Sequence, residues 1–158
     1  MKRIVILGRG AAGKSTFART LGRITGIPVI ELDKLFWQAG LVPMTRDEWV
    51  RTQRNLVSTD SWIMDGDLGP YDAPEIRLSA ADTVVILDYS LARCAWNAVR
   101  RSRERLDFWW WLMTYRFKSR PALLRAISTH ARHTRLYTLR NPKAVPRLLA
   151  ELQLRSVE

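Results

Sequence analysis

Several residue types are scarce in this chain, and each shortage excludes a class of protein. The single cysteine, Cys94, excludes a disulfide within the chain. The two histidines, His130 and His133, have no cysteine or carboxylate beside them, so they do not predict a metal site. No apolar run reaches the length of a membrane span, and the first residues show no signal-peptide cleavage pattern. We therefore expect a cytoplasmic protein that does not enter a membrane.

Acidic residues are also few, at 15 against 26 basic ones, and the formal net charge is +11. Such an excess attracts nucleotides, phosphorylated substrates, nucleic acid or anionic lipid, and does not distinguish among them. An arginine-rich proteome would produce the same excess. The 158 residues contain no repeat and no linker, and 47% of them are hydrophobic. They predict one globular domain over residues 1–158.

A phosphate-binding motif stands near the start of the chain. Residues 8–15 fit the P-loop pattern G-x-x-x-x-G-K-[ST]. The apolar run 3–7 before it has the composition of a buried parallel strand, and residues 15–23 after it have helical spacing. A strand, a glycine loop and a helix in this order are the context in which the motif binds the polyphosphate of a nucleotide such as ATP.

Each residue type in the motif has a chemical reason. The glycines let the backbone turn tightly and bring successive N–H groups close to phosphate oxygens. Lys14 places a positive charge on the β- and γ-phosphates, and Ser15 can ligate Mg²⁺ with Thr16 as a second hydroxyl nearby. The predicted nucleotide-binding residues of the loop are Gly8, Gly10, Ala11, Ala12, Gly13, Lys14, Ser15 and Thr16.

Beyond the P-loop, apolar runs alternate with helical patterns. Further strands are predicted over residues 28–32, 62–64, 83–87 and 135–139, and helices over 46–59, 91–105, 121–133 and 142–152. The alternation predicts an α/β fold with a parallel sheet covered by helices on both faces. Ligands in such folds bind at the carboxyl ends of the strands.

Carboxylates follow several of these predicted strands. Asp33 and Asp65 follow strands that we expect to neighbour the P-loop strand, where they can orient a hydroxyl or hold the water shell of Mg²⁺. Asp88 directly precedes a helical stretch, and we expect it to cap that helix.

The chain resembles the P-loop kinases of the nucleoside monophosphate kinase and shikimate kinase group, and within them the adenylate kinase-like proteins termed DNA topology modulation proteins. The matching stretches are residues 8–16, 32–37, 62–67, Arg77 with 81–83, and 116–121. The resemblance implies the P-loop NTPase three-layer sandwich, in which a five-stranded parallel sheet has the order 2-3-1-4-5. Relatives carry Asn-Tyr where this chain has Asp67-Leu68.

The resemblance also implies roles for single residues. Asp33 would contact the acceptor, Asp65 would lie near the metal's water shell, and Arg77 would grip an anionic group of the acceptor. A short lid over about residues 100–120 would supply arginines to the phosphates, and residues 141–144 would lie against the base. The candidate lid arginines are Arg100, Arg101, Arg103 and Arg105.

The sequence thus predicts a kinase that transfers the γ-phosphoryl group of ATP, with Mg²⁺, to a small acceptor such as a nucleoside monophosphate. The predicted catalytic residues are Lys14, Asp33, Arg77 and Arg101; Arg105 and Asn141 join the P-loop on the nucleotide; Ser15 and Asp65 hold the metal. We expect a monomer or homodimer.

Two alternatives stay open at this point. One is a DNA-binding or DNA-topology regulatory protein, favoured by the charge and by the aromatic segment 108–113 with nearby basic residues, although those aromatics are more typical of a packed helix. The other is a nucleotide switch without an acceptor.

Overall fold

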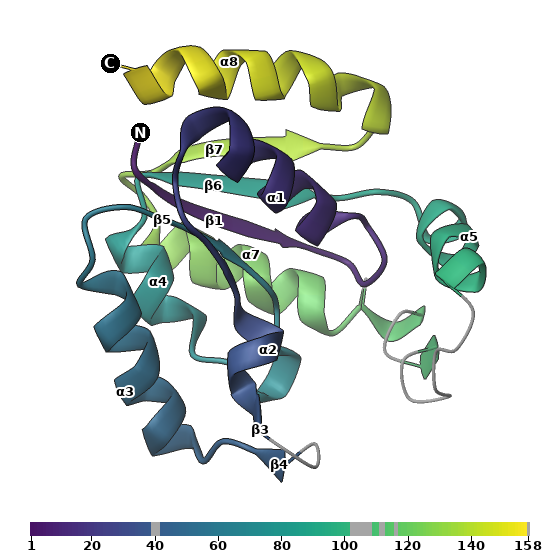
Figure 1. The fold of residues 1–158 in the computed structure, drawn as a ribbon. Coiled ribbons are helices and arrows are strands. Elements are labelled where there is room, and N and C mark those ends of the chain that lie inside the picture. The colour runs from purple at the N-terminus through teal and green to yellow at the C-terminus, as the bar shows by residue number, and fades with distance from the viewer. Residues whose placement is uncertain (39–41, 102–108, 111–112, 116, 158) are drawn as a thin grey trace.

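A central parallel sheet organises the molecule. The computed structural model describes residues 1–38, 42–101, 109–110, 113–115 and 117–157. The sheet has five strands in the order β2-β5-β1-β6-β7, each parallel to its neighbours (Figure 1). The strands are β1 (Arg3–Gly8), β2 (Val29–Glu31), β5 (Trp62–Asp65), β6 (Thr83–Leu87) and β7 (Arg135–Leu139). Counted along the sheet strands alone, this is the order 2-3-1-4-5, so the predicted fold class is confirmed.

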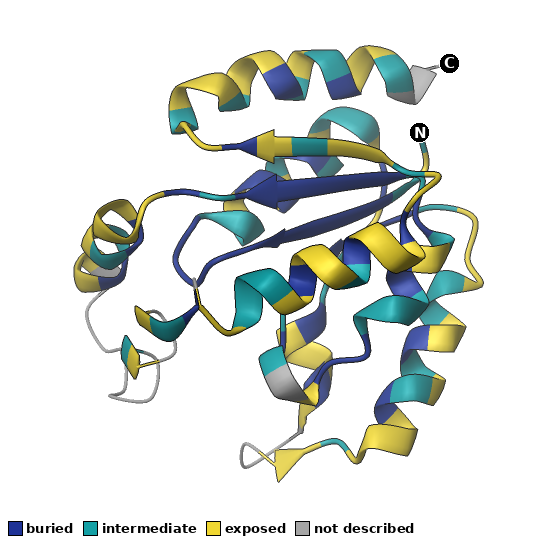
Figure 2. Cartoon of the chain, turned by 180° about the vertical axis from the view of Figure 1, so that it is seen from behind, coloured by how far each residue is buried: buried dark blue, intermediate teal, exposed yellow. Residues whose placement is uncertain are grey.

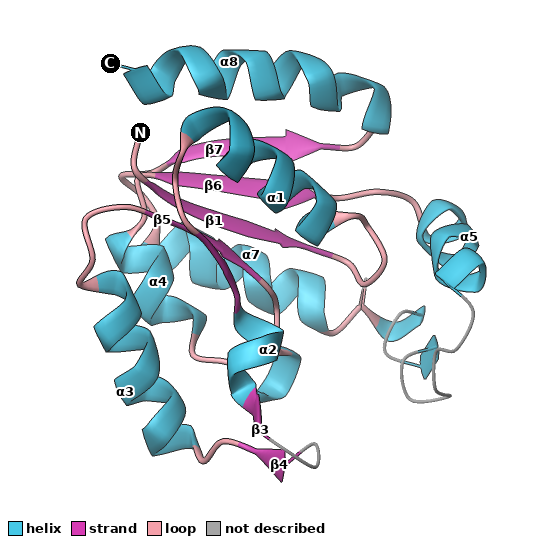
Figure 3. Cartoon of the chain, viewed as in Figure 1, coloured by secondary structure: helices cyan, strands magenta, loops and turns pink. Residues whose placement is uncertain are grey.

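Helices cover both faces of this sheet, as Figure 3 shows. The α-helices are α1 (Lys14–Thr25), α2 (Leu32–Phe36), α3 (Arg46–Val57), α4 (Pro74–Ala80), α5 (Leu91–Arg101), α7 (Ser119–His130) and α8 (Val145–Val157). Two 3-10 turns, η1 (Gly69–Tyr71) and η2 (Pro142–Ala144), precede α4 and α8, and β3 (Trp37–Gln38) and β4 (Val42–Pro43) form a small antiparallel hairpin. Helices α1 and α8 pack together on one face, and α3, α4 and α7 cover the other.

The two-residue period of the strands divides the core between these faces. In β1, Ile4 and Ile6 join the cluster that contains Leu21 of α1 and Leu152 of α8. The alternate residues Val5 and Leu7 join a second cluster, with residues of α3, α4 and α7. Strands β1, β5 and β6 are buried along their lengths, whereas the edge strand β7 is largely exposed (Figure 2). The sheet is therefore sandwiched, as its apolar strands predicted.

Most element bounds lie close to those predicted, and the exceptions are short elements. Helix α4 has seven residues, too few for a helical period to show, and it was not predicted. The hairpin β3–β4 was also missed. The predicted helix 142–152 begins as the 3-10 turn η2 and continues as α8. Within the described residues, no helix is long and apolar enough to cross a membrane.

Candidate active site

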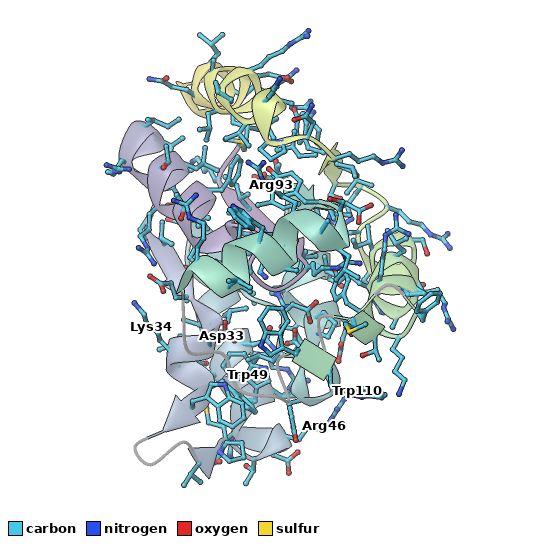
Figure 4. All side chains as sticks on the ribbon, turned by 90° about the vertical axis from the view of Figure 1, so that its right-hand side faces the viewer. Asp33, Lys34, Arg46, Trp49, Arg93 and Trp110 are labelled. Carbon is cyan, nitrogen blue, oxygen red and sulfur yellow. The ribbon has the colours of Figure 1, made fainter. Side chains whose placement is uncertain are left out.

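The P-loop joins β1 to α1 at the carboxyl edge of the sheet, which faces the viewer in Figure 4. At Gly8 the backbone has φ 143°, and a Cβ there would lie 2.5 Å from the carbonyl oxygen of Leu87. Gly13 caps α1 in the left-handed conformation, with φ 87°. Because a side chain is strained at both positions, glycine is required to bring the loop into this shape.

The side chain of Lys14 folds back over the preceding residues of the P-loop. Its Nζ donates hydrogen bonds to the carbonyl oxygens of Gly8 at 3.0 Å and Arg9 at 3.2 Å. On the other side, the Asn97 amide of α5 donates to the carbonyl of Ala11 at 3.0 Å. The loop is thus a closed turn with an ammonium group at its centre and the N-terminus of the 12-residue helix α1 beside it. Both features favour an anion.

Asp65 ends β5, the strand next to the P-loop strand. Its side chain is 3% exposed and its Oδ1 is buried without a hydrogen-bond partner. Burial raises the pKa of Asp65, while the hydroxyl of Ser15, within hydrogen-bonding reach, and the charge of Lys14 lower it. Among the described residues, no three His, Cys, Asp or Glu side chains come together as a metal site. An unpaired carboxylate oxygen beside a serine fits an Mg²⁺ ion whose other ligands are phosphate oxygens and water.

Asp33 is the second residue of α2 and is exposed at the same edge, as Figure 4 shows. The surrounding protein still raises its pKa through desolvation, opposed by Lys14 and reinforced by the charges of Asp65 and Asp67. Desolvation also raises the pKa of Asp67, whose carboxylate accepts a hydrogen bond from the Gly69 N–H at 3.0 Å. The structure thus brings the predicted Asp33, Asp65 and Lys14 into one electrostatic neighbourhood.

Arg77 lies in the core of the α3–α4 face with no exposed surface. Its guanidinium binds both oxygens of Asp72, at 2.8 and 2.6 Å, and donates to Gln53 Oε1 at 3.0 Å and to the Gly66 carbonyl at 3.2 Å. Burial alone would raise the pKa of Asp72, but the charge and hydrogen bonds of Arg77 hold it below its usual value. Direct contact between Arg77 and an acceptor stays a prediction, and it would require this pair to open.

The opposite side of the P-loop carries arginines around Asp88. Arg120 of α7 binds the carboxylate of Asp88, with Nη2 at 2.8 Å from Oδ2 and Nε at 3.1 Å from Oδ1. This pair and Arg140 line two adjoining cavities of about 580 and 600 Å³. Asn141 lines the second cavity and accepts a hydrogen bond from the Lys143 N–H. These cavities have the size of a small-molecule site beside the P-loop.

The role expected for Asp88 differs from its contacts. The hydroxyl of Ser90, rather than the Asp88 carboxylate, accepts a hydrogen bond from the Arg93 N–H at the start of α5. The hydrogen bond from Arg120 lowers the pKa of Asp88, against some desolvation. Asp88 binds Arg120 because the start of α7 lies beside the residue that follows β6, and local sequence does not reveal this contact.

The lid predictions are only partly covered by the described residues. Arg103, Arg105 and the side chain of Arg101 lie outside them, and Arg100 is exposed on α5. Thr16 is exposed along α1, where it borders a hollow with Arg19 and Arg23. In the aromatic segment, Trp109 packs on the core, Trp110 is 70% exposed, and both Trp111 and Phe108 lie outside the described residues.

Sequence reasoning missed two residues that shape the site. Arg9 is 6% exposed, and its guanidinium carbon lies 5.3 Å from the centre of the Tyr115 ring. The P-loop pattern did not indicate Arg9, because it occupies a variable position of the pattern. Asp72 was not singled out, because Arg77, its partner, was expected to bind an anionic group of the acceptor. An Asp followed five residues later by an Arg on a short helix is a pattern that could have suggested the pair.

Comparisons with known proteins agree on the fold. No protein-family model matches the chain, and no curated protein matches it. Among solved structures, shikimate kinase from Acinetobacter baumannii in complex with shikimate aligns with a TM-score of 0.63 and 20% identity, covering 98% of this chain and 93% of that one.

Two further structures give the same picture. Shikimate kinase from Bacteroides thetaiotaomicron aligns with a TM-score of 0.58 and 15% identity, covering 99% of both chains. A gluconokinase from Sinorhizobium meliloti aligns with a TM-score of 0.58 and 14% identity, covering 99% of this chain and 91% of that one. The chain therefore shares, over nearly its whole length, the P-loop fold of small-molecule kinases.

Proposed function

We propose that this chain is a kinase that transfers the γ-phosphoryl group of ATP to a hydroxyl group of a small molecule. The observation that carries the proposal is the grouping of a formed P-loop with Lys14 and the carboxylates Asp33 and Asp65 at one edge of the sheet. A nucleotide switch needs the loop and one carboxylate for the metal, whereas the further carboxylate Asp33 provides for a second substrate. The shared fold with shikimate kinase and gluconokinase supports the same class.

In this proposal, each group has one task. The loop N–H groups and Lys14 bind the β- and γ-phosphates and neutralise charge as it develops. Ser15 and the unpaired Oδ1 of Asp65 would hold Mg²⁺. When bound, the ion supplies charge neutralisation to the phosphate oxygens.

The acceptor hydroxyl would bind at Asp33. Its oxygen bonds to the γ-phosphorus, the bond from that phosphorus to the β,γ-bridging oxygen breaks, ADP leaves, and Asp33 accepts the hydroxyl proton. The raised pKa of Asp33 makes it a stronger base than an ordinary carboxylate. The lid residues Arg101 and Arg105 are proposed to reach the phosphates, and Asn141 to border the base. The similarity to adenylate kinase-like proteins enters this proposal for the fold and the ATP site alone, because those enzymes transfer the phosphoryl group to a phosphate and not to a hydroxyl. A cytoplasmic location and a monomer or homodimer remain part of the proposal.

Calorimetry of Mg·ATP binding to the purified chain tests the donor half. Lys14→Ala should weaken binding at least about tenfold, because a hydrogen bond to a charged group contributes about 1.5–3 kcal/mol. Lys34→Ala is the matched control, because Lys34 is exposed and paired with Glu31 at 3.0 Å. Equal affinities for wild type and Lys14→Ala would overturn the proposal.

A second candidate function is nucleic-acid binding through the exposed aromatic side chains of the lid region. Trp110 and Phe117 are 70% and 80% exposed, and the exposed Lys118 follows them. Stacking on such rings and contacts of lysine with phosphate are the usual means of binding single strands. Affinity for single-stranded DNA that falls steeply with salt and falls again in Trp110→Ala would support this candidate.

A further inference from the structure

We propose that the acceptor carries no negative charge, and that a protonated amine on the acceptor strengthens its binding. This inference rests on the proposed function, because it concerns the acceptor half of the same site. It sets this chain apart from the proteins with which it shares its fold, since those named above are kinases of carboxylates, shikimate and gluconate.

The acceptor side of the P-loop is lined by carboxylates. Asp33 is the second residue of α2, Asp65 ends β5, and Asp67 lies two residues further along the chain. Each of them interacts with Lys14, and the negative charges of Asp65 and Asp67 act on Asp33. The proposed Mg²⁺ would offset the charge of Asp65, but an anionic group placed beside Asp33 and Asp67 would meet the repulsion of both, in surroundings that screen it less than water does.

The arginine that could offset these charges is already bound. Arg77 is wholly buried, and both oxygens of Asp72 are engaged with its guanidinium. Its remaining nitrogen, Nε, has no hydrogen-bond partner but has no contact with solvent. Releasing Arg77 would leave Asp72, with a side chain 3% exposed, as an uncompensated buried charge. While the pair is closed, Arg77 offers no positive charge to an acceptor.

A cavity of about 470 Å³, within the size range of small-molecule sites, is lined by Asp67, Asp72 and Trp110 among others. An indole ring such as that of Trp110 can hold a cation over its face. Lys118 is the cation among its described lining residues. It is exposed, so water and salt screen its charge. The lining of the cavity thus includes both carboxylates and an aromatic ring.

Matched six-carbon acceptors test the inference on the full chain. Glucosamine, glucose and gluconate carry a positive charge, no charge and a negative charge on similar polyol skeletons. With a non-hydrolysable Mg·ATP analogue present, calorimetry should give affinities in the order glucosamine, glucose, gluconate, with the first at least about tenfold above the last. Adenosine compared with AMP extends the test to a nucleoside. Tighter binding of gluconate, shikimate or AMP than of the matched neutral or cationic compound would overturn the inference, as would a failure of every amine and neutral compound to bind.

Substitutions locate the effect. Asp67→Asn keeps an oxygen to accept the Gly69 N–H but removes the charge, so the preference for glucosamine over glucose should fall several-fold. Asp60→Asn is the control, because Asp60 is exposed before β5, at the opposite edge of the sheet. An unchanged preference in Asp67→Asn would also overturn the inference. Phosphorylation of an anionic acceptor would overturn the inference about charge but leave the proposed kinase function standing. Failure of the wild type to bind Mg·ATP would overturn the kinase function itself.

Discussion

Breaking the buried pair of Arg77 and Asp72 should cost far more stability than breaking an exposed pair. The salt bridge measures 2.6 Å between Arg77 Nη2 and Asp72 Oδ2, and the two side chains are 0% and 3% exposed. Arg77→Met leaves a buried carboxylate whose remaining hydrogen bonds come from the Ala73 N–H at 2.9 Å and two weaker donors at 3.4 Å. Removing one partner of such a pair typically costs about 3–5 kcal/mol.

The reverse variant, Asp72→Leu, leaves the guanidinium with only Gln53 Oε1 and the Gly66 carbonyl among its present partners. We expect a loss at the upper end of the same range, because the charge that remains has fewer groups to solvate it. The double variant should be more stable than the sum of the two losses implies, because no unpaired charge stays buried.

Urea unfolding followed by tryptophan fluorescence measures these losses. With a slope of about 1–3 kcal/mol per molar urea, each single variant should shift the midpoint by roughly 1–5 M if the fold survives. Arg155→Met is the control, because its ion pair with Glu151 is 36% and 43% exposed and should contribute under about 1 kcal/mol. Losses below about 1 kcal/mol in both single variants would refute the reasoning and would restore Arg77 as a candidate for direct contact with the acceptor.

The pair also predicts a pH dependence. The folded chain holds the pKa of Asp72 below its ordinary value of 3.8. The unfolded chain therefore takes up the proton first on acidification, so the contribution to stability is complete above pH 3.8 and is lost as the pH falls through the folded pKa. Asp72→Asn should remove this part of the acid sensitivity, which acid titrations of both proteins would measure.

Three further outcomes follow from the site. Gly8→Ala should cost at least about 2 kcal/mol of unfolding free energy and weaken Mg·ATP binding, because its Cβ would meet the Leu87 carbonyl, whereas Gly26→Ala, with φ 73° and open space around it, should cost about 1 kcal/mol. Asp65→Asn should raise the melting temperature at pH 7 while weakening Mg·ATP binding, because a raised folded pKa means that ionised Asp65 opposes folding once the pH exceeds its unfolded value. In the pH profile of kcat/KM, the midpoint of the acidic limb should lie above pH 3.8, because ionised Asp33 is required and its pKa is raised. A midpoint at or below pH 3.8 would contradict the role of Asp33.

The fold could be predicted in large part because its signals are local. The P-loop fixes a strand, a turn and a helix within a few residues, and the apolar runs at β5 and β6 show buried strands directly. Strand order followed from the family resemblance, not from these runs. Helix α4 and the hairpin β3–β4 were missed because they are too short to show a period.

In the candidate site, too, positions near a strand end could be predicted, whereas contacts between distant elements could not. Asp33 and Asp65 could be placed from sequence, because parallel strands deliver their carboxyl ends to one edge. The contacts of Arg77 with Asp72, and of Arg120 with Asp88, could not, because each joins elements whose packing depends on the tertiary structure. Charge type was visible in the sequence, whereas the partner of each charge was not.

Transfer of the γ-phosphoryl group tests the central claim most directly. Wild type and Asp33→Asn would each be incubated with Mg·ATP and a mixture of amino sugars, sugars, nucleosides and hydroxy acids, and ³¹P NMR would record the products. We expect the wild type to form ADP together with a new phosphate ester, and Asp33→Asn to bind Mg·ATP normally while forming the ester at least about a hundredfold more slowly. Ester formation at equal rates in both proteins, or ADP and inorganic phosphate as the only products across neutral, cationic and anionic acceptors, would contradict the account.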